Sequence, residues 1–237
     1  MADLVVAAED LAGAVPLEGG NMDRLSATFL SIAEQQAVTA AVQEAEKQTS
    51  GEIVPMVVSA SHHYPLAAAT GATLISLPLA LLLTSTFGTA LWLGTQNMYL
   101  FLTFFALLYF PARWLVNRFP TLKRLFLSVR DVDEEVEEAA ITTFYGEGLY
   151  KTREQNGILI FISVLEQKVW ILGDCGVNDR IDPGTWQEII EKLTAGIHSG
   201  ERGPALCRAV SAVGEILRHH FPIRADDHNE LHNIIIK

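Results

Sequence analysis

The feature that most constrains this chain is a stretch of 60 residues, 53–112, without a single Asp, Glu, Lys or Arg. It contains two apolar segments, 66–93 and 98–116, on either side of a short polar turn. A helix needs about 20 apolar residues to cross a hydrocarbon core about 30 Å thick. The sequence therefore predicts a transmembrane helical hairpin over 66–118. The alternative is a buried hairpin in a soluble core, but the rest of the chain is too short to cover so much apolar surface.

Positive charge follows the second apolar segment, and no acidic residue interrupts it before Asp131. Because cytoplasmic flanks of membrane helices are rich in Lys and Arg, we expect a cytoplasmic (inner) membrane protein with both hairpin ends, the soluble domain and both termini in the cytoplasm. Aromatic residues near both ends of the helices fit interfacial belts in the bilayer. The residues that predict this topology are Arg113, Arg118, Lys123, Arg124, Trp92, Tyr99 and Trp114.

Two small residues, Ala67 and Gly71, are four positions apart in the first apolar segment. Small residues at this spacing let membrane helices approach closely, so they predict helix packing and a homo-oligomer as one form of it. The alternative is that alanine is simply common in interfacial helices.

Composition narrows the functional classes. The net charge of −11 makes the soluble surface acidic, which excludes nucleic acid as the expected partner. The two cysteines, Cys175 and Cys207, lack metal-like spacing and should stay reduced in the cytoplasm. Residues 1–22 lack the basic region of a signal peptide and are expected to form a flexible arm.

Outside the hairpin, the periodicity of apolar residues predicts elements in the order helix, strand, hairpin, helix, strand, strand, helix, helix. Ser31 and Glu34 form a capping box that opens the first helix. The strand at 52–60 contains Pro55, which indicates an edge position or a bulge. Asp131 is predicted to cap the helix after the hairpin. The later elements are strands at 157–164 and 168–172, a helix from Asp182-Pro183 to about His198, and a helix opened by Gly203-Pro204.

The first two strands are joined through a helix, so they should be parallel with a right-handed crossover. The next two strands are joined by a tight turn and should be antiparallel. These elements predict a three-layer α/β/α sandwich with a mixed sheet, formed by 23–60 and 128–224 and interrupted by the hairpin. Residues 225–237 are expected to form a tail with a short docking segment.

Several of these segments resemble the TPM domain family. The resemblance rests on Thr49-Ser50-Gly51-Glu52-Ile53-Val54, on the strand at 157–163 and on the segment 169–177, and the closing segment 205–231 is similar to a bacterial membrane branch of the family. It implies an α/β domain, together with the acid phosphatase activity and calcium binding ascribed to exported members. It also implies LemA-type or similar membrane proteins as partners.

The loop 173–182 is the best candidate for chemistry, because ligands gather at strand ends in α/β sheets. Its carboxylates Asp174, Asp179 and Asp182 predict a site for Ca²⁺ or Mg²⁺, which bind oxygen ligands. Glu52 is a weaker partner, expected at the other end of the sheet. Asp182 is also explained as a helix N-cap and Asp179 as a loop residue, so Asp174 is the first choice as ligand.

Cysteine catalysis is disfavoured, because neither cysteine lies in the C-x5-R pattern of a phosphatase loop. His228 and His232 have metal-compatible spacing but need further ligands. The leading hypothesis is a membrane-anchored interaction or assembly factor bound to the lipid bilayer and other membrane proteins. The alternative is a Ca²⁺- or Mg²⁺-dependent phosphomonoesterase.

Overall fold

The computed structural model of the chain describes residues 5–11, 25–90, 97–223 and 235–236. The chain divides into two compact units. One contains the described residues of 1–16, 23–62 and 132–237, and the other contains residues 63–131. The hairpin is thus inserted, along the chain, between two parts of one α/β unit.

The α/β unit mixes helices and strands along the chain. In chain order they are β1 (Val5–Asp10), α1 (Leu25–Phe29), α2 (Ile32–Glu46), β2 (Glu52–Val58), α6 (Val129–Gly146, which starts at the boundary between the units), a 3₁₀ turn (Leu149–Lys151), β3 (Gly157–Ser163), β4 (Lys168–Gly173), α7 (Cys175–Asn178), α8 (Pro183–His198), α9 (Arg202–His220) and β5 (Ile235–Ile236).

A five-stranded sheet in the order β1-β4-β3-β2-β5 forms the centre of this unit. β2 is parallel to β3 and β4 is antiparallel to β3, which confirms the predicted mixed sheet. The sequence suggested an edge position for Pro55. Instead, Pro55 lies in β2, which has β5 as a neighbour on its outer side. However, β5 pairs only with Met56 and Val57, so a proline without an N–H is tolerated here.

Both edge strands come from segments that the sequence placed in a flexible arm and a tail. Residues 5–10 pair with β4 in antiparallel fashion, so this part of the N-terminal segment is a strand. Ile235 and Ile236 pair with β2 in parallel fashion, which is the docking expected of the apolar C-terminal residues. Apart from Leu11, the remaining residues of both segments, including His228 and His232, lie outside the described residues.

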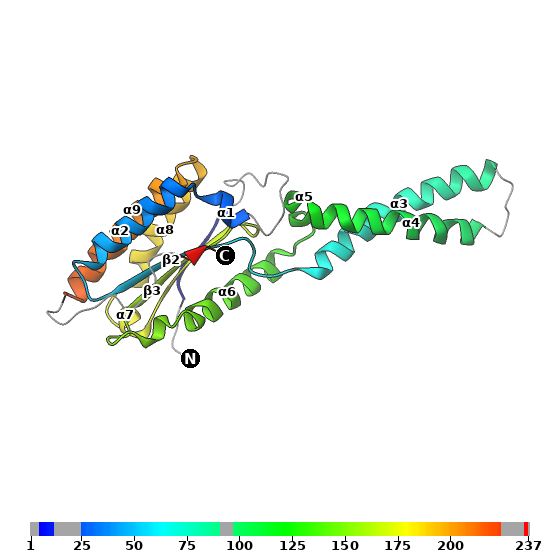
Figure 1. Cartoon of the computed structure of the whole chain (residues 1–237). Coiled ribbons are helices and arrows are strands. Elements are labelled where there is room, and N and C mark those ends of the chain that lie inside the picture. The colour runs from blue at the N-terminus through cyan, green and yellow to red at the C-terminus, as the bar shows by residue number, and fades with distance from the viewer. Residues whose placement is uncertain (1–4, 12–24, 91–96, 224–234, 237) are drawn as a thin grey trace. The chain divides into compact units, whose positions relative to one another are not determined.

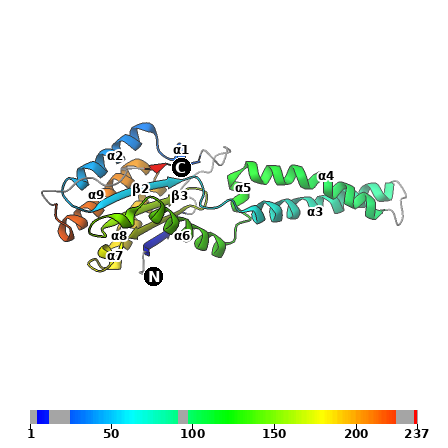
Figure 2. The same cartoon turned by 60° about the horizontal axis from the view of Figure 1, so that its bottom comes forward.

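Helices cover both faces of the sheet, as predicted for a three-layer sandwich. α2, α8 and α9 pack on one face, with α9 between the other two, and Figures 1 and 2 show α6 on the opposite face. Every residue of β3 is buried, as expected for the central strand of a covered sheet. The largest fully buried apolar side chains are Trp186, Phe144, Phe161 and Phe221, and each contributes roughly 2–3 kcal/mol on burial.

Caps at helix starts explain two of the helix boundaries. The Ser31–Glu34 capping box is present at the start of α2, as predicted. Asp182 caps α8, and its Oδ1 accepts a hydrogen bond from Gly184 N at 2.7 Å. Asp131 is not a cap: α6 begins at Val129, so Asp131 lies in the first turn, where the helix dipole still favours a negative charge.

The second unit contains α3 (Pro65–Ala90), α4 (Asn97–Arg118) and the short α5 (Pro120–Arg124). α3 and α4 pack against each other, and both are long and apolar enough to cross a membrane by length and composition alone. Pro78 and Pro111 lie within these helices, which continue through them. The turn between the helices, including Trp92, lies outside the described residues.

Candidate functional site at the amino end of the central strands

Strand register places Glu52 and Asp174 at the same end of the sheet. Glu52 lies opposite Gly157, and Asp174 N donates a hydrogen bond to Gly157 O at 3.0 Å. The expectation that Glu52 lies at the other end from the 173–182 loop is wrong, because β4 runs against β3 and ends where β2 and β3 begin. A Cβ on Gly157 would lie 2.6 Å from Leu149 O, so the 3₁₀ turn covers the glycine between the two acids.

Asp174 is nearly buried, with 7% of its surface exposed. It is the N-cap of α7, and its Oδ1 accepts a hydrogen bond from Cys175 N at 2.8 Å. Its Oδ2 is buried and has no hydrogen-bond partner among the described residues. A Cβ on Gly176 would lie 2.5 Å from Glu154 O, so this helix turn sits directly against the preceding loop. Asp174 is therefore a buried capping residue with one oxygen to spare.

The other two carboxylates of the predicted metal site, Asp179 and Asp182, lie in different surroundings. Asp182 is exposed and occupied by the cap of α8, and Asp179 is exposed at the end of α7. Within the described residues, no group of three or more His, Cys, Asp or Glu side chains is placed to hold a metal ion. Asp174, Asp179 and Asp182 are thus not such a group among the described residues, and a Ca²⁺ or Mg²⁺ site at this loop stays a prediction.

The two thiols are not activated. Burial raises the pKa of the Cys175 thiol, and the neighbouring Asp174 carboxylate raises it further. Burial also raises the pKa of the Cys207 thiol, on α9. A thiol is a nucleophile as the thiolate, so both environments work against nucleophilic catalysis.

A set of polar contacts that sequence reasoning missed fixes the loops at this end of the sheet. Asn156 Nδ2 donates to Ser50 O at 2.8 Å, and Ser50 Oγ donates to Glu154 Oε2 at 2.9 Å. Thr49 Oγ1 donates to Phe221 O at 2.6 Å. The only sequence signal for these residues is their position just before the two strand-opening residues Glu52 and Gly157.

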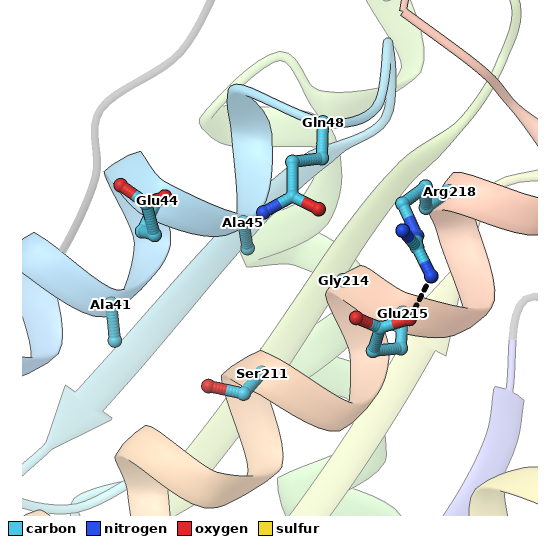
Figure 3. Close-up of a pocket in the computed structure, with 8 residues that line it drawn as sticks. All are labelled: Ala41, Glu44, Ala45, Gln48, Ser211, Gly214, Glu215 and Arg218. Carbon is cyan, nitrogen blue, oxygen red and sulfur yellow. Dashed lines mark hydrogen bonds and ion pairs between the residues drawn. The ribbon is translucent and has the colours of Figure 1, made fainter.

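Two grooves lie on the helical face that contains α9. The larger, about 720 Å³, lies between α8 and α9, and its floor is apolar, with Ile189, Leu193 and Ile216 among its lining residues. The smaller, about 280 Å³, lies between α2 and α9 (Figure 3). There α2 and α9 approach closely, because a Cβ on Gly214 would lie 2.6 Å from Ala45 Cβ. The residues that line it are Ala41, Glu44, Ala45, Gln48, Ser211, Gly214, Glu215 and Arg218, and Glu215 and Arg218 form an ion pair at 2.7 Å.

The residues that predicted helix packing are buried within the second unit. Ala67 is 6% exposed, and a Cβ on Gly71 would lie 2.6 Å from the ring of Phe126. Phe126 follows α5 in the same chain, so the close approach that Gly71 permits is already used within this hairpin. The Gly71 face is therefore covered by the chain itself and is not open to a second copy.

The basic residues predicted at the membrane interface have different environments. Lys123 is buried, and its Nζ donates a hydrogen bond to His63 O, so it ties the segment after α4 to the start of the hairpin. Arg113 Nη1 donates to Tyr109 OH at 3.4 Å, one turn earlier on α4. Tyr99, Trp114 and Arg118 are exposed, which is compatible with the interfacial positions predicted for them.

Comparison with known proteins finds a family match over part of the chain and one similar fold. Residues 122–216 match the TPM domain, a match that starts within α5 and ends within α9. None of the curated proteins compared matches the chain. The NMR structure of the BA42 protein from the psychrophilic bacterium Bizionia argentinensis is similar in fold, with a TM-score of 0.54 and 20% sequence identity over 88% of this chain and 95% of that one.

Proposed function

Since the chain carries a TPM domain, we propose that it is a membrane-anchored protein that uses this domain to bind or assemble other membrane proteins. The helical hairpin holds the domain at the cytoplasmic face of the membrane. The domain and the hairpin surface supply contacts to the partners. The proposal thus separates an anchoring part and a binding part that one chain carries together.

The observation that carries the proposal is the apolar surface of α3 and α4. Soluble proteins rarely expose contiguous apolar patches larger than a few hundred Å², and larger ones mark contact with a membrane or another protein. Here large apolar side chains are exposed along both helices, and no acidic side chain accompanies them. Those more than half exposed are Leu66, Leu74, Leu81, Leu82, Met98, Tyr99, Leu102, Leu107, Phe110 and Trp114.

The distribution of charge supports the orientation. No charged residue occurs in α3 or before Arg113 in α4, whereas arginines at 113, 118, 124 and 130 follow with no acid among them. Because positive flanks are retained in the cytoplasm, this charge pattern supports a cytoplasmic position for both ends of the hairpin and for the TPM domain. The same arginines suit anionic lipid headgroups at that surface.

Partner binding is supported by the surface left open on both units. On α4 the exposed residues Tyr99, Leu102, Phe110 and Trp114 recur at helical spacing, which suits packing against a further membrane helix. On the TPM domain, the apolar groove between α8 and α9 suits an apolar side chain of a partner. The partner class is an integral membrane protein, of the LemA type or similar, or a second copy of this chain.

Crosslinking in native membranes, followed by affinity isolation and mass identification, tests this function. Leu107→Ala and Phe110→Ala remove exposed apolar side chains from α4, and we expect them to reduce the recovered partners. Leu81→Ala and Leu82→Ala make a matched control, because these exposed leucines lie on α3. If all four variants recover the same partners, assembly through α4 is contradicted. If the protein itself is recovered in the soluble fraction, membrane anchoring is contradicted.

A further inference from the structure

The chain leaves β2 for the hairpin through residues 59–62, which we name the departure segment, and it re-enters the α/β unit at α6. Both places contact the same short turn, residues 163–168, which links β3 to β4. We infer that this turn is a clamp that holds the two segments of the α/β unit from which the chain enters the hairpin and to which it returns. All residues of the clamp belong to the α/β unit.

The outgoing side of the clamp is built on Glu166, which is only 2% exposed. Its Oε1 accepts a hydrogen bond from Ser61 N at 3.0 Å, and its Oε2 accepts one from Ser163 Oγ. Ser61 Oγ in turn donates to Ser163 Oγ at 3.0 Å. A buried carboxylate is destabilising unless it is hydrogen-bonded. Ser61 of the departure segment donates to Glu166 through its backbone N–H, and its hydroxyl donates to the Ser163 hydroxyl that in turn donates to Glu166.

Backbone contacts extend the β2–β3 ladder into the departure segment. Val164 N donates to Val58 O at 3.0 Å, and Leu165 N donates to Ser59 O at 3.1 Å. On the other side, Ser59 Oγ accepts a hydrogen bond from Ser26 N at 3.1 Å. The segment is thus held from both sides before the chain reaches the hairpin.

The returning side of the clamp is ionic. Lys168, the first residue of β4, places Nζ 2.9 Å from Asp133 Oδ1 in the first turns of α6. The Lys168 side chain is 15% exposed, so this pair is less screened than the surface pairs of the domain. His62 Nδ1 lies 4.0 Å from Glu135 Oε2, which also brings the departure segment next to α6. Both flanking segments therefore contact the β3–β4 turn or the helix that is ion-paired to it.

This arrangement links the two flanking segments of the hairpin to one turn within the α/β unit. Glu166 holds the outgoing segment and Lys168 the returning segment, two residues apart on one turn. Loss of the Glu166 contacts frees the departure segment without removing any strand of the sheet. The clamp is a conformational device that goes beyond anchoring, because it makes the state of the two flanking segments depend on two side chains of the domain.

Hydrogen exchange measured by mass spectrometry on the full chain in detergent or nanodiscs tests the clamp. Glu166→Ala removes both acceptors, and we expect amides of residues 59–63 to exchange at least about tenfold faster, because hydrogen bonds to charged groups are the stronger ones. Glu166→Gln keeps an acceptor for Ser61 N and should give a smaller increase. Glu188→Gln is the control, because Glu188 is an exposed carboxylate on α8 that pairs with Lys192 at 2.6 Å.

A crosslink keeps the test informative if Glu166→Ala loosens the whole domain. Ser61→Cys with Ser163→Cys, in a background without Cys175 and Cys207, should form a disulfide readily, since the two hydroxyl oxygens are 3.0 Å apart. When oxidised, it should restore slow exchange at residues 59–63 in the Glu166→Ala chain. The inference is overturned if exchange there is unchanged by Glu166→Ala, if α2 and α9 accelerate equally, or if the crosslink restores nothing.

Discussion

Glu34 joins the starts of two helices, and its substitution gives the sharpest stability prediction. Its Oε2 accepts hydrogen bonds from Ser31 N at 2.8 Å and Ser31 Oγ at 2.7 Å, which complete the capping box of α2. Its Oε1 accepts a hydrogen bond from Gly203 N at 3.2 Å, in the first turn of α9. A Cβ on Gly203 would lie 2.5 Å from Glu34 Cγ, so only glycine allows this approach.

The contacts set the expected magnitude. A cap contributes about 0.5–2 kcal/mol and a net hydrogen bond about 0.5–1.5 kcal/mol, with exposed sites at the lower end. Glu34→Ala should therefore lower the free energy of opening at both helix starts by about 1–2 kcal/mol. Glu34→Gln should cost about 0.5 kcal/mol, because it loses mainly the charge that favours the two helix dipoles.

The dependence on pH follows from the same contacts. Hydrogen bonds from the backbone and side chain of Ser31 lower the pKa of Glu34 in the folded chain. The stabilisation is therefore complete above the pKa of Glu34 in the unfolded chain, and it is lost as pH falls through the lower folded pKa. Glu34→Gln should remove this acid-dependent part of the stability.

Hydrogen exchange in full-length protein measures both ends of the bridge. We expect about tenfold faster exchange in peptides from the first turns of α2 and of α9 for Glu34→Ala, since about 1.4 kcal/mol corresponds to a factor of ten. Glu44→Ala is the control on the same helix, because Glu44 forms an exposed pair with Lys47 at 2.9 Å. Faster exchange in α2 with no change in α9 would refute the bridge.

Three further substitutions or treatments test separate parts of the structure. Gly71→Ala should destabilise the hairpin unit by about 1–3 kcal/mol in thermal unfolding, because the Phe126 ring lies 2.6 Å from the added Cβ, whereas Gly146→Ala, with nothing within 4 Å, should not. Gly157→Ala should lower the free energy of unfolding of the TPM domain by a similar amount in urea titrations, because the added Cβ meets the backbone oxygen of Leu149. An unchanged urea midpoint contradicts the close contact between Leu149 and Gly157. Cys175 should react with iodoacetamide more slowly than a free cysteine at pH 7.5 and faster as pH rises, because its thiol pKa is raised; fast labelling at neutral pH contradicts its burial.

The elements that the sequence predicted well have strong local signals. The absence of charge over 60 residues located the hairpin, and the observed helices Pro65–Ala90 and Asn97–Arg118 differ from the predicted segments by a few residues at their ends. The Ser31–Glu34 box located the start of α2, and the continuous apolar run at Gly157–Ser163 located the buried central strand. Each of these depends on neighbours in the sequence.

The elements that were missed depend on distant partners. The edge strand Val5–Asp10 exists beside β4, and Ile235–Ile236 is too short to show any periodicity. Glu52 was placed at the wrong end of the sheet, although the predicted parallel and antiparallel pairs together put it at the end where β4 finishes. Ser61 and Glu166 are 105 residues apart, and no spacing in the sequence indicates that they meet.

The candidate site also depends on the three-dimensional placement of its residues, which their spacing in the sequence does not show. Asp174 was the first choice as a metal ligand, which stays a prediction; it is the buried N-cap of α7, with one oxygen unpartnered among the described residues. Its cluster with Asp179 and Asp182 was inferred from proximity along the chain alone. A four-residue helix and the start of α8 instead direct these carboxylates into separate caps and solvent.

Cysteine labelling in intact cells tests the central claim, a hairpin that crosses the membrane from a cytoplasmic TPM domain. In a chain without Cys175 and Cys207, Met98→Cys places a thiol at an exposed position near the start of α4, and Glu188→Cys places one on the exposed face of α8. We predict that a membrane-impermeant maleimide labels Met98→Cys from outside, and Glu188→Cys only after the membrane is opened. Labelling of both positions only after opening, or both from outside, would contradict the account.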